Sequence, residues 1–275
     1  DSSILTSETC ALDIIGAEFV REIENGEIVV ISNDGVQSIK PFNVNPERPC
    51  IFEYIYFARP DSIVSGLSVY ECRKNFGKQL AKESPTDADV VVPVPDSGVP
   101  AAIGFAEQSA TPFDLGIIRN HYVGRTFIEP AQSTRDFGVK LKHNINRNAI
   151  FGKKVVLIDD SIVRGTTSIK IVELMRNAGA RELHMKIASP PIKFPDFYGI
   201  DTPESKQLLA AEKSLEEMAR FIGVDSLSFL SLDGLYKAMG HPLGRDPSCP
   251  AYTDHCFTGD YPTPLQDNST EWLRE

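Results

Sequence analysis

Apolar segments that alternate with amphipathic segments run through the chain from Phe52 to Ser189. The runs DVVVPVP, VVLID and LHMKIAS have the length of buried strands, and segments with helical spacing of apolar residues lie between such runs. This alternation requires crossover connections, which make consecutive strands parallel. We predict an α/β fold with a mostly parallel sheet and helices on both faces. The other predicted elements are strands at FEYIYF and LGII, and helices at Val69–Glu83, at Val99–Ser109 and from Gly165 to a capping glycine at Gly179.

Two flanking regions differ from this pattern. From Glu18 to Lys40, the runs FVREI, EIVVIS and VQSI are separated by Asn-Gly and Asp-Gly turns, which indicates an antiparallel meander. Two or three strands bury too little to be stable alone, so the meander has to pack on the main domain or on a part of the protein not present here. Beyond Ser189 we expect helices around Pro203–Ile222 and Leu230–Met239, then an irregular tail. The predicted parts are 1–45, 46–200 and 201–275.

Composition excludes several classes of protein. With 275 residues, 41% of them hydrophobic, the chain is long enough for one large core with an appendage. No apolar run approaches the ~20 residues of a membrane-spanning helix, and the first thirty residues lack the layout of a signal peptide. Five cysteines, an odd number, favour a reducing compartment, so we expect a cytoplasmic protein with no membrane partner. The net charge of −10 argues against nucleic acid as a partner.

Two adjacent carboxylates follow the apolar run VVLI. Asp159 and Asp160 are followed by the segment from Ser161 to Thr167, which opens the next helix. Backbone N–H groups and threonine hydroxyls at a helix N-terminus bind phosphate, and carboxylates beside them suit sugar hydroxyls or Mg²⁺ on the same ligand. The alternative is structural, with Asp159 capping the helix and Asp160 solvated.

A second loop of similar character follows VVVPVP. Asp96, Ser97 and Gly98 form a predicted tight turn that offers donors to an anion. Such a tripeptide is also common turn chemistry, and alone it indicates little. In open parallel sheets, however, ligands bind beyond the carboxyl ends of the strands, where both loops would lie. Two anion sites that flank a pair of diol-binding carboxylates suit a ribose phosphorylated at both ends.

Positive charge is concentrated between Arg119 and Arg147, with six basic side chains against two acidic ones. This segment is far longer than an ordinary strand-to-helix loop, and long loops in compact domains are often lids. A lid that carries Arg125, Lys140 and Lys142 would close over pyrophosphate. The alternative is a solvated basic loop.

The segment LIDDSIVRGTT resembles the 5-phosphoribosyl-1-pyrophosphate (PRPP) motif of type I phosphoribosyltransferases. Within that group the chain resembles the family of glutamine PRPP amidotransferases, which carry out the first step of purine biosynthesis, and the likeness extends from about Ser7 to Pro264. The segments that carry this likeness are NHYVGRTFIEPAQ, HMKIASPPI, FYGIDTP, LSFLSLDGL and CFTGDYPT.

The resemblance implies a role for each site residue. Asp159 and Asp160 would hold the ribose hydroxyls and Mg²⁺, with Ser97 also near the metal, and Asp96 to Gly98 would border the pyrophosphate. Tyr122, Arg125 and Lys142 would act from the lid on the reacting end. The substrates would be PRPP and ammonia, or glutamine through another domain, with purine nucleotides as inhibitors and a homo-oligomeric assembly. The 5-phosphate would be cradled by Ser161, Ile162, Val163, Arg164, Gly165, Thr166 and Thr167.

Two departures from the family pattern stand out. SETCALDIIGAEF resembles the end of the family's glutaminase half, so we expect the meander to be a remnant of that domain and the glutaminase cysteine to be absent from this chain; Cys10 is not that residue. One branch of the family also carries an iron–sulfur cluster on four cysteines. Cys50 and Cys256 match two of the ligand positions, but Asp196 and Thr253 occupy the others, so we expect no cluster, although Cys249 could shift into service.

Three other functions would leave different sequence patterns. A PRPP-sensing regulator of the same fold would keep LIDDSIVRGTT without needing the lid, and VGRTFI with the basic segment favours the enzyme. A DNA-binding regulator would show a basic domain, and none is visible outside the segment from Arg119 to Arg147. A phospho-acceptor receiver domain would spread its carboxylates over several loops and have no use for RGTT.

Overall fold

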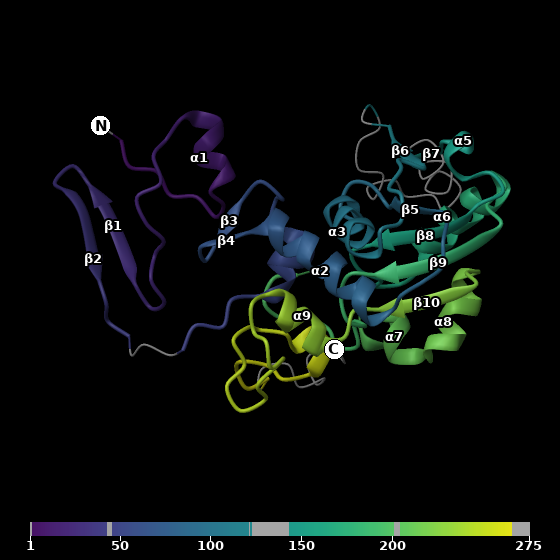
Figure 1. Ribbon diagram of the computed structural model, residues 1–275. Coiled ribbons are helices and arrows are strands. Elements are labelled where there is room, and N and C mark those ends of the chain that lie inside the picture. The colour runs from purple at the N-terminus through teal and green to yellow at the C-terminus, as the bar shows by residue number, and fades with distance from the viewer. Residues whose placement is uncertain (1, 43–45, 121, 123–142, 201–203, 266–275) are drawn as a thin grey trace, which may run out of the picture.

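The computed structural model describes residues 2–42, 46–120, 122, 143–200 and 204–265. Within these residues, the centre of the fold is a sheet of four parallel strands in the order β10-β9-β8-β5 (Figure 1). The predicted mostly parallel α/β sheet is confirmed. The strands are β5 (Val90–Pro93), β8 (Lys154–Asp159), β9 (Glu182–Ile187) and β10 (Ser226–Phe229).

Helices cover both faces of this sheet, as predicted. Side chains of β8 alternate between two hydrophobic cores: Val156 and Ile158 pack in the first, and Val155 and Leu157 pack in the second. Helices α2 and α3 contribute to the first core, and α6 and α8 contribute to the second. These helices are α2 (Val69–Glu83), α3 (Val99–Ser109), α6 (Thr166–Asn177) and α8 (Leu215–Ile222).

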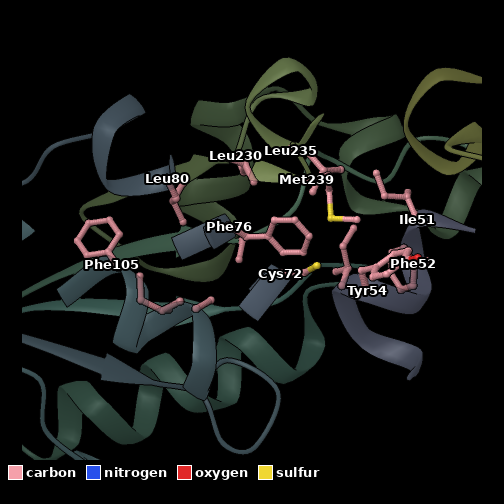
Figure 2. Close-up of a cluster of buried hydrophobic side chains, with 14 of the residues drawn as sticks. Ile51, Phe52, Tyr54, Cys72, Phe76, Leu80, Phe105, Leu230, Leu235 and Met239 are labelled. Atoms are coloured by element: carbon pink, nitrogen blue, oxygen red, sulfur yellow. The ribbon is translucent and has the colours of Figure 1, made fainter. Parts of the chain in front are cut away.

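Helix α2 has the bounds that its sequence predicts. Ser68 caps its first turn by accepting a hydrogen bond from the Glu71 N–H at 3.4 Å. Cys72, Phe76 and Leu80 recur at helical spacing and lie in the first core beside Tyr54 and Met239 (Figure 2). Helix α6 also has the predicted amphipathic face, and Gly179 after it has a φ of +93°.

The segment FEYIYF is not a strand, which corrects our prediction. Residues Glu53–Phe57 form the π-helical turn η1, with Tyr54 and Ile55 fully buried. A short apolar run has the same pattern in a buried helix and in a buried strand. The guanidinium of Arg73 stabilises the helical form by donating to the carbonyls of Tyr54 and Ala58.

The C-terminal region also differs from the prediction. The expected helix at Pro203–Ile222 is divided into η3 (Ser205–Gln207), α7 (Leu209–Glu212) and α8. Helix α8 begins as a separate helix because Ser214 and Glu217 form a capping box. The side chain of each residue accepts a hydrogen bond from the backbone N–H of the other. Strand β10 was not predicted.

Only two strands form in the N-terminal meander within the described residues. β1 (Ile28–Ser32) and β2 (Gly35–Ile39) pair antiparallel, whereas FVREI forms no strand. This hairpin lies apart from the sheet in Figure 1 and has many exposed apolar side chains. In the described part of the chain, no helix is long and apolar enough to cross a membrane.

Smaller elements complete the described structure, including the antiparallel strands β6 and β7, which lie near the two ends of the basic segment 119–147. They are α1 (Cys10–Ile15), β3 (Ile63–Val64), β4 (Leu67–Ser68), β6 (Ile117–Arg119), β7 (His143–Ile145), α5 (Arg147–Ile150), α9 (Leu232–Ala238) and α10 (His255–Thr258).

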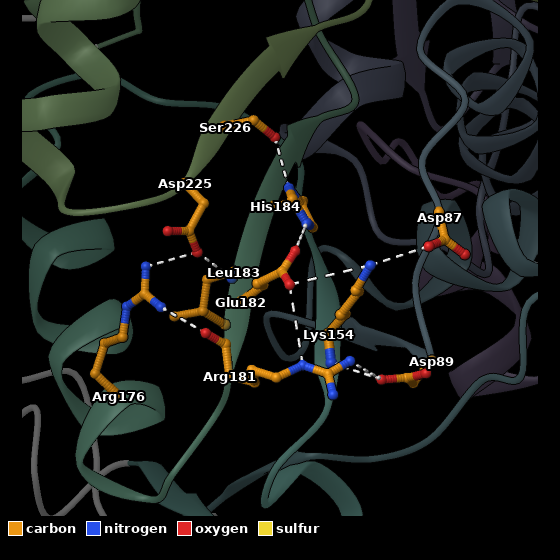
Figure 3. A network of polar contacts seen from close by, with 10 residues as sticks. All are labelled: Asp87, Asp89, Lys154, Arg176, Arg181, Glu182, Leu183, His184, Asp225 and Ser226. Carbon is orange, nitrogen blue, oxygen red and sulfur yellow. Dashed lines mark hydrogen bonds and ion pairs between the residues drawn. The ribbon is translucent and has the colours of Figure 1, made fainter.

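Charged side chains pair with one another at the amino end of the sheet (Figure 3). Lys154 Nζ lies 3.0 Å from Asp87 Oδ2, and Arg176 Nη2 lies 2.8 Å from Asp225 Oδ2. This end is therefore a solvated rim of ion pairs. The two loops singled out by sequence lie at the opposite, carboxyl end.

Candidate functional site

The loops after β5 and β8 lie side by side. Pro93 pairs with Ile158 in the parallel register, and the Val94 N–H donates to the Ile158 carbonyl at 2.8 Å. The loop then folds back, because the Gly98 N–H donates to the Val94 carbonyl at 3.0 Å. A Cβ atom on Gly98 would lie 2.5 Å from the Ile158 oxygen, so glycine is required for this approach. The segment 96–98 therefore lies beside the carboxyl end of β8.

Asp159 is the last residue of strand β8 and Asp160 follows it, and both are largely buried. Asp159 Oδ1 accepts from the Asp160 N–H at 3.0 Å, and Asp160 Oδ2 accepts from the Ser161 hydroxyl at 2.7 Å. Burial raises the pKa of Asp159 well above its usual value, and the neighbouring charge of Asp160 raises it further. Two buried carboxylates so close together suit a cationic or hydroxyl-rich ligand.

The turn after the carboxylates opens helix α6. Gly165 has a φ of +75°, and a Cβ atom there would lie 2.8 Å from Leu209 Cδ2, so both conformation and packing favour glycine. In the described structure no side chain caps the first turn of α6, which leaves backbone N–H groups for an anion. Thr166 and Thr167 are exposed at this turn.

Two of the predicted cradle residues have side chains in the protein interior. Ile162 is buried in the second core, and Val163 packs against the first. These residues can therefore offer a ligand only backbone groups. The Arg164 guanidinium donates to Gln207 Oε1 at 3.0 and 3.2 Å, which fixes the turn against η3.

Asp96 forms an ion pair with Arg119, the last residue of β6. This contact joins the second loop to the start of the basic segment. Tyr122 is fully exposed, and its N–H donates to Asn120 Oδ1 at 3.0 Å. Arg125, Lys140 and Lys142 lie outside the described residues.

Sequence reasoning missed a buried cation on helix α2. Arg73 lies on α2, is 4% exposed, and has its pKa lowered by burial while the charge of Asp160 raises it. The sequence does contain a signal for this residue, because Arg73 is a charged residue on the apolar face of α2, between Val69 and Phe76. No sequence pattern predicts the ion pair between Asp96 and Arg119.

Comparison with known proteins agrees with this geometry. The model of the phosphoribosyl transferase domain family matches residues 66–189, which include both loops. An amidophosphoribosyltransferase of Rhizobium etli is 63% identical over 98% of this chain and 55% of its own length. One of Bacillus subtilis is 50% identical over 100% of this chain and 58% of its own length.

This chain is similar to the phosphoribosyltransferase part of amidophosphoribosyltransferases. A solved structure described as glutamine PRPP amidotransferase from B. subtilis complexed with ADP and GMP has a TM-score of 0.85 and 51% identity, covering 96% of this chain and 57% of that one. The chain thus spans little more than half the length of these family members. The matched range 66–189 lies inside the range 46–200 predicted from sequence, whose boundaries remain a prediction.

The residues at the carboxyl ends of β5 and β8 fit Mg²⁺ in their donor chemistry. Carboxylate and hydroxyl oxygens are the ligands that this ion prefers, and it commonly binds through one or two carboxylates and substrate phosphates. Asp159 and Asp160 supply the carboxylates, and Ser97 supplies a hydroxyl in the adjacent loop.

The four positions that correspond to the family's cluster ligands gather at another place in the fold. Cys50 forms a β-bridge with Thr253, and Asp196 Oδ2 lies 2.7 Å from His255 Nε2, around a cavity of about 270 Å³. Asp196 is thus engaged by an imidazole, and thiolates are the usual cluster ligands. The described residues contain no group of three or more His, Cys, Asp or Glu arranged to hold a metal ion. These residues do not fit an iron–sulfur cluster, and its absence remains a prediction.

Proposed function

We propose that this chain carries the PRPP site of an amidophosphoribosyltransferase, which forms 5-phosphoribosylamine and pyrophosphate from PRPP and ammonia. One observation carries the proposal: Gly98 packs against the backbone of Ile158, so Asp96 to Gly98 lie beside Asp159 and Asp160. An anion-binding turn on each side of a carboxylate pair fits a ribose with phosphate groups at both ends. The high identity to named amidophosphoribosyltransferases supports the same substrate.

Each part of the site has a role in this proposal. Asp159 and Asp160 would hold the ribose hydroxyls and Mg²⁺ together with Ser97, and Asp96 to Gly98 would border the pyrophosphate. Backbone groups of Ser161 to Thr167 would bind the 5-phosphate at the start of α6. Tyr122, Arg125 and Lys142 would contact the reacting end from the segment 119–147, as the family resemblance implies.

The reaction needs no nucleophilic side chain. The bond between C1 of the ribose and pyrophosphate breaks, and its electron pair leaves with the pyrophosphate oxygen. The lone pair of ammonia forms the new C1–N bond, and the resulting ammonium group loses a proton to water. Mg²⁺ would neutralise charge on the leaving pyrophosphate. The protein's part is to orient C1 and to stabilise the developing charge.

The wider assembly belongs to the same proposal. In the whole protein, glutamine would supply the ammonia through a glutaminase domain of which 1–45 is the last part. Purine nucleotides as inhibitors, a homo-oligomer and a cytoplasmic location also remain proposals. The B. subtilis structure in complex with ADP and GMP supports purine nucleotides as ligands of a relative.

Calorimetry with PRPP and Mg²⁺ tests the site. The double variant Asp159→Asn/Asp160→Asn should bind PRPP roughly 100-fold more weakly, because two charge-assisted interactions are lost. Asp87→Asn is the matched control, since Asp87 pairs with Lys154 at the opposite end of β8. Unchanged affinity in the double variant would refute the assignment. Binding without turnover would favour a PRPP-sensing regulator.

A further inference from the structure

Residues 205–209, which include η3 and the first residue of α7, lie against the turn between β8 and α6. The Leu209 N–H donates to the Val163 carbonyl at 2.9 Å. At the next position of the turn, the Arg164 guanidinium donates to Gln207 Oε1 through Nε at 3.2 Å and through Nη2 at 3.0 Å. These hydrogen bonds join the turn to the C-terminal region of the chain.

The Leu209 side chain packs against the end of the same turn. Leu209 is 6% exposed and shares the second core with Ile162. A Cβ atom on Gly165, the N-cap of α6, would lie 2.8 Å from Leu209 Cδ2 and 3.5 Å from Phe221 Cε1. The backbone at Gly165 is therefore in close contact with Leu209 and has little room to move toward it.

Segment 205–209 thus holds the turn at three successive residues, Val163, Arg164 and Gly165. The groups proposed to bind the 5-phosphate here are backbone N–H groups, and their directions are set by the conformation of the turn. Donors that already point toward an anion bind it more tightly than donors that must be ordered on binding, because ordering costs free energy. The contacts with segment 205–209 supply this order before the substrate arrives.

The turn 96–98, proposed for the pyrophosphate end, is held by other parts of the protein. The Gly98 N–H donates to the Val94 carbonyl at 3.0 Å, and Asp96 forms an ion pair with Arg119. The two ends of the proposed site therefore have separate supports. A change in segment 205–209 should affect the two ends of the substrate unequally.

We propose that Leu209 and Gln207 are positioning residues for the 5-phosphate turn, through which the C-terminal region sets the affinity for one end of PRPP. The inference deepens the proposed function and rests on it. Leu209 fixes the backbone at Val163 and Gly165, and Gln207 fixes the Arg164 side chain between them. Neither residue has to touch the substrate in order to act on its binding.

Calorimetry on the protein as encoded, with any flanking sequence, separates the two ends of PRPP. The dissociation constant of PRPP is measured with Mg²⁺ present, and ribose 5-phosphate and pyrophosphate are then titrated as competitors. We expect Leu209→Ala to weaken binding of PRPP and ribose 5-phosphate roughly tenfold, and Gln207→Ala roughly threefold, because each removes a support of the turn. The affinity for pyrophosphate should stay within about twofold of the wild type in both variants.

Two matched controls separate positioning from stability, with the melting temperature recorded for every variant. Leu227→Ala removes the same side chain from the same second core, but in β10. Ser205→Ala changes an exposed residue of η3. Both should keep the wild-type affinity for all three ligands. If Leu209→Ala fails to fold, Leu209→Val replaces it, with a smaller loss expected at the 5-phosphate end because less of the side chain is removed.

Several outcomes would overturn the inference. Wild-type affinity for ribose 5-phosphate in a folded Leu209 variant, or an equal loss in Leu227→Ala, would leave Leu209 with a role in stability alone. Equal losses for ribose 5-phosphate and pyrophosphate would refute separate supports. Tighter binding in Gln207→Ala would mean that Gln207 keeps Arg164 away from the phosphate. A wild-type protein that does not bind PRPP would refute the proposed function itself, and the inference with it.

Discussion

Gly98 is the residue at which the two loops of the site touch. An alanine Cβ atom there would lie 2.5 Å from the Ile158 oxygen and 2.9 Å from the Val94 oxygen. Because both atoms belong to the backbone, the loop has to move away from β8. We predict that Gly98→Ala lowers the free energy of unfolding by roughly 1–3 kcal/mol and weakens PRPP binding. Chemical denaturation and calorimetry check this, with Ser97→Ala as the stability control in the same loop. Wild-type stability and affinity in Gly98→Ala would contradict the close approach.

Lys186 is a buried lysine on β9 whose ammonium donates to the Ser228 hydroxyl at 3.2 Å. Burial lowers its pKa from 10.5 to about 8. In the unfolded chain the pKa is the ordinary one, so above about pH 8 the unfolded state binds more protons and rising pH favours the folded state at this residue.

Lys186→Met should therefore be more stable than the wild type near pH 7, by roughly 1–2 kcal/mol, because a buried charge is removed. The advantage should shrink as pH rises from about 8 to about 10, where the folded lysine is neutral. Urea unfolding of both proteins across this pH range measures the difference between their free energies of unfolding. The contributions of the other titrating groups cancel in that difference. An advantage that stays constant with pH would contradict the lowered pKa.

At the scale of elements, prediction from sequence succeeded where local patterns decide the structure. The apolar spacing and caps of α2 and α6 lie within the elements themselves, and their alternation with strands gave the parallel sheet. It failed for η1, whose helical form depends on Arg73, a residue on another helix. The break between α7 and α8 had a local signature in Ser214 and Glu217 that we overlooked.

Helices α2 and α3 cross at two glycines. A Cβ atom on Gly77 would overlap the carbonyl of Ala101, and one on Gly104 would overlap the carbonyl of Lys74. Since helix backbones cannot yield locally, we predict that Gly77→Ala or Gly104→Ala destabilises the protein by roughly 3 kcal/mol, although alanine has the higher helix propensity. Thermal and urea unfolding test this against Lys82→Ala, an exposed change in α2 that should have little effect. Increased stability in either glycine variant would refute the close crossing.

At the scale of the molecule, the sequence identified the two loops, because residues after parallel strands meet at one edge of the sheet. It could not show that Ile162 and Val163 have their side chains in the cores, or that Asp96 pairs with Arg119. These contacts join segments far apart in the chain and depend on tertiary packing. The roles of Tyr122, Arg125 and Lys142 remain predictions.

Pyrophosphate release from PRPP, with Mg²⁺ present and a single nitrogen source, tests the central claim most directly. Free ammonia has the lone pair that C1 requires, whereas ammonium ion does not, so the rate with ammonium chloride should rise from about pH 7 to about pH 9. We propose no glutamine-hydrolysing residue in this chain, so glutamine alone should give no release. Asp159→Asn/Asp160→Asn should be inactive with either source. Ammonia-dependent release by the wild-type chain that is lost in this variant is the predicted result, and a folded wild-type chain that releases no pyrophosphate with ammonia at high pH would contradict the account.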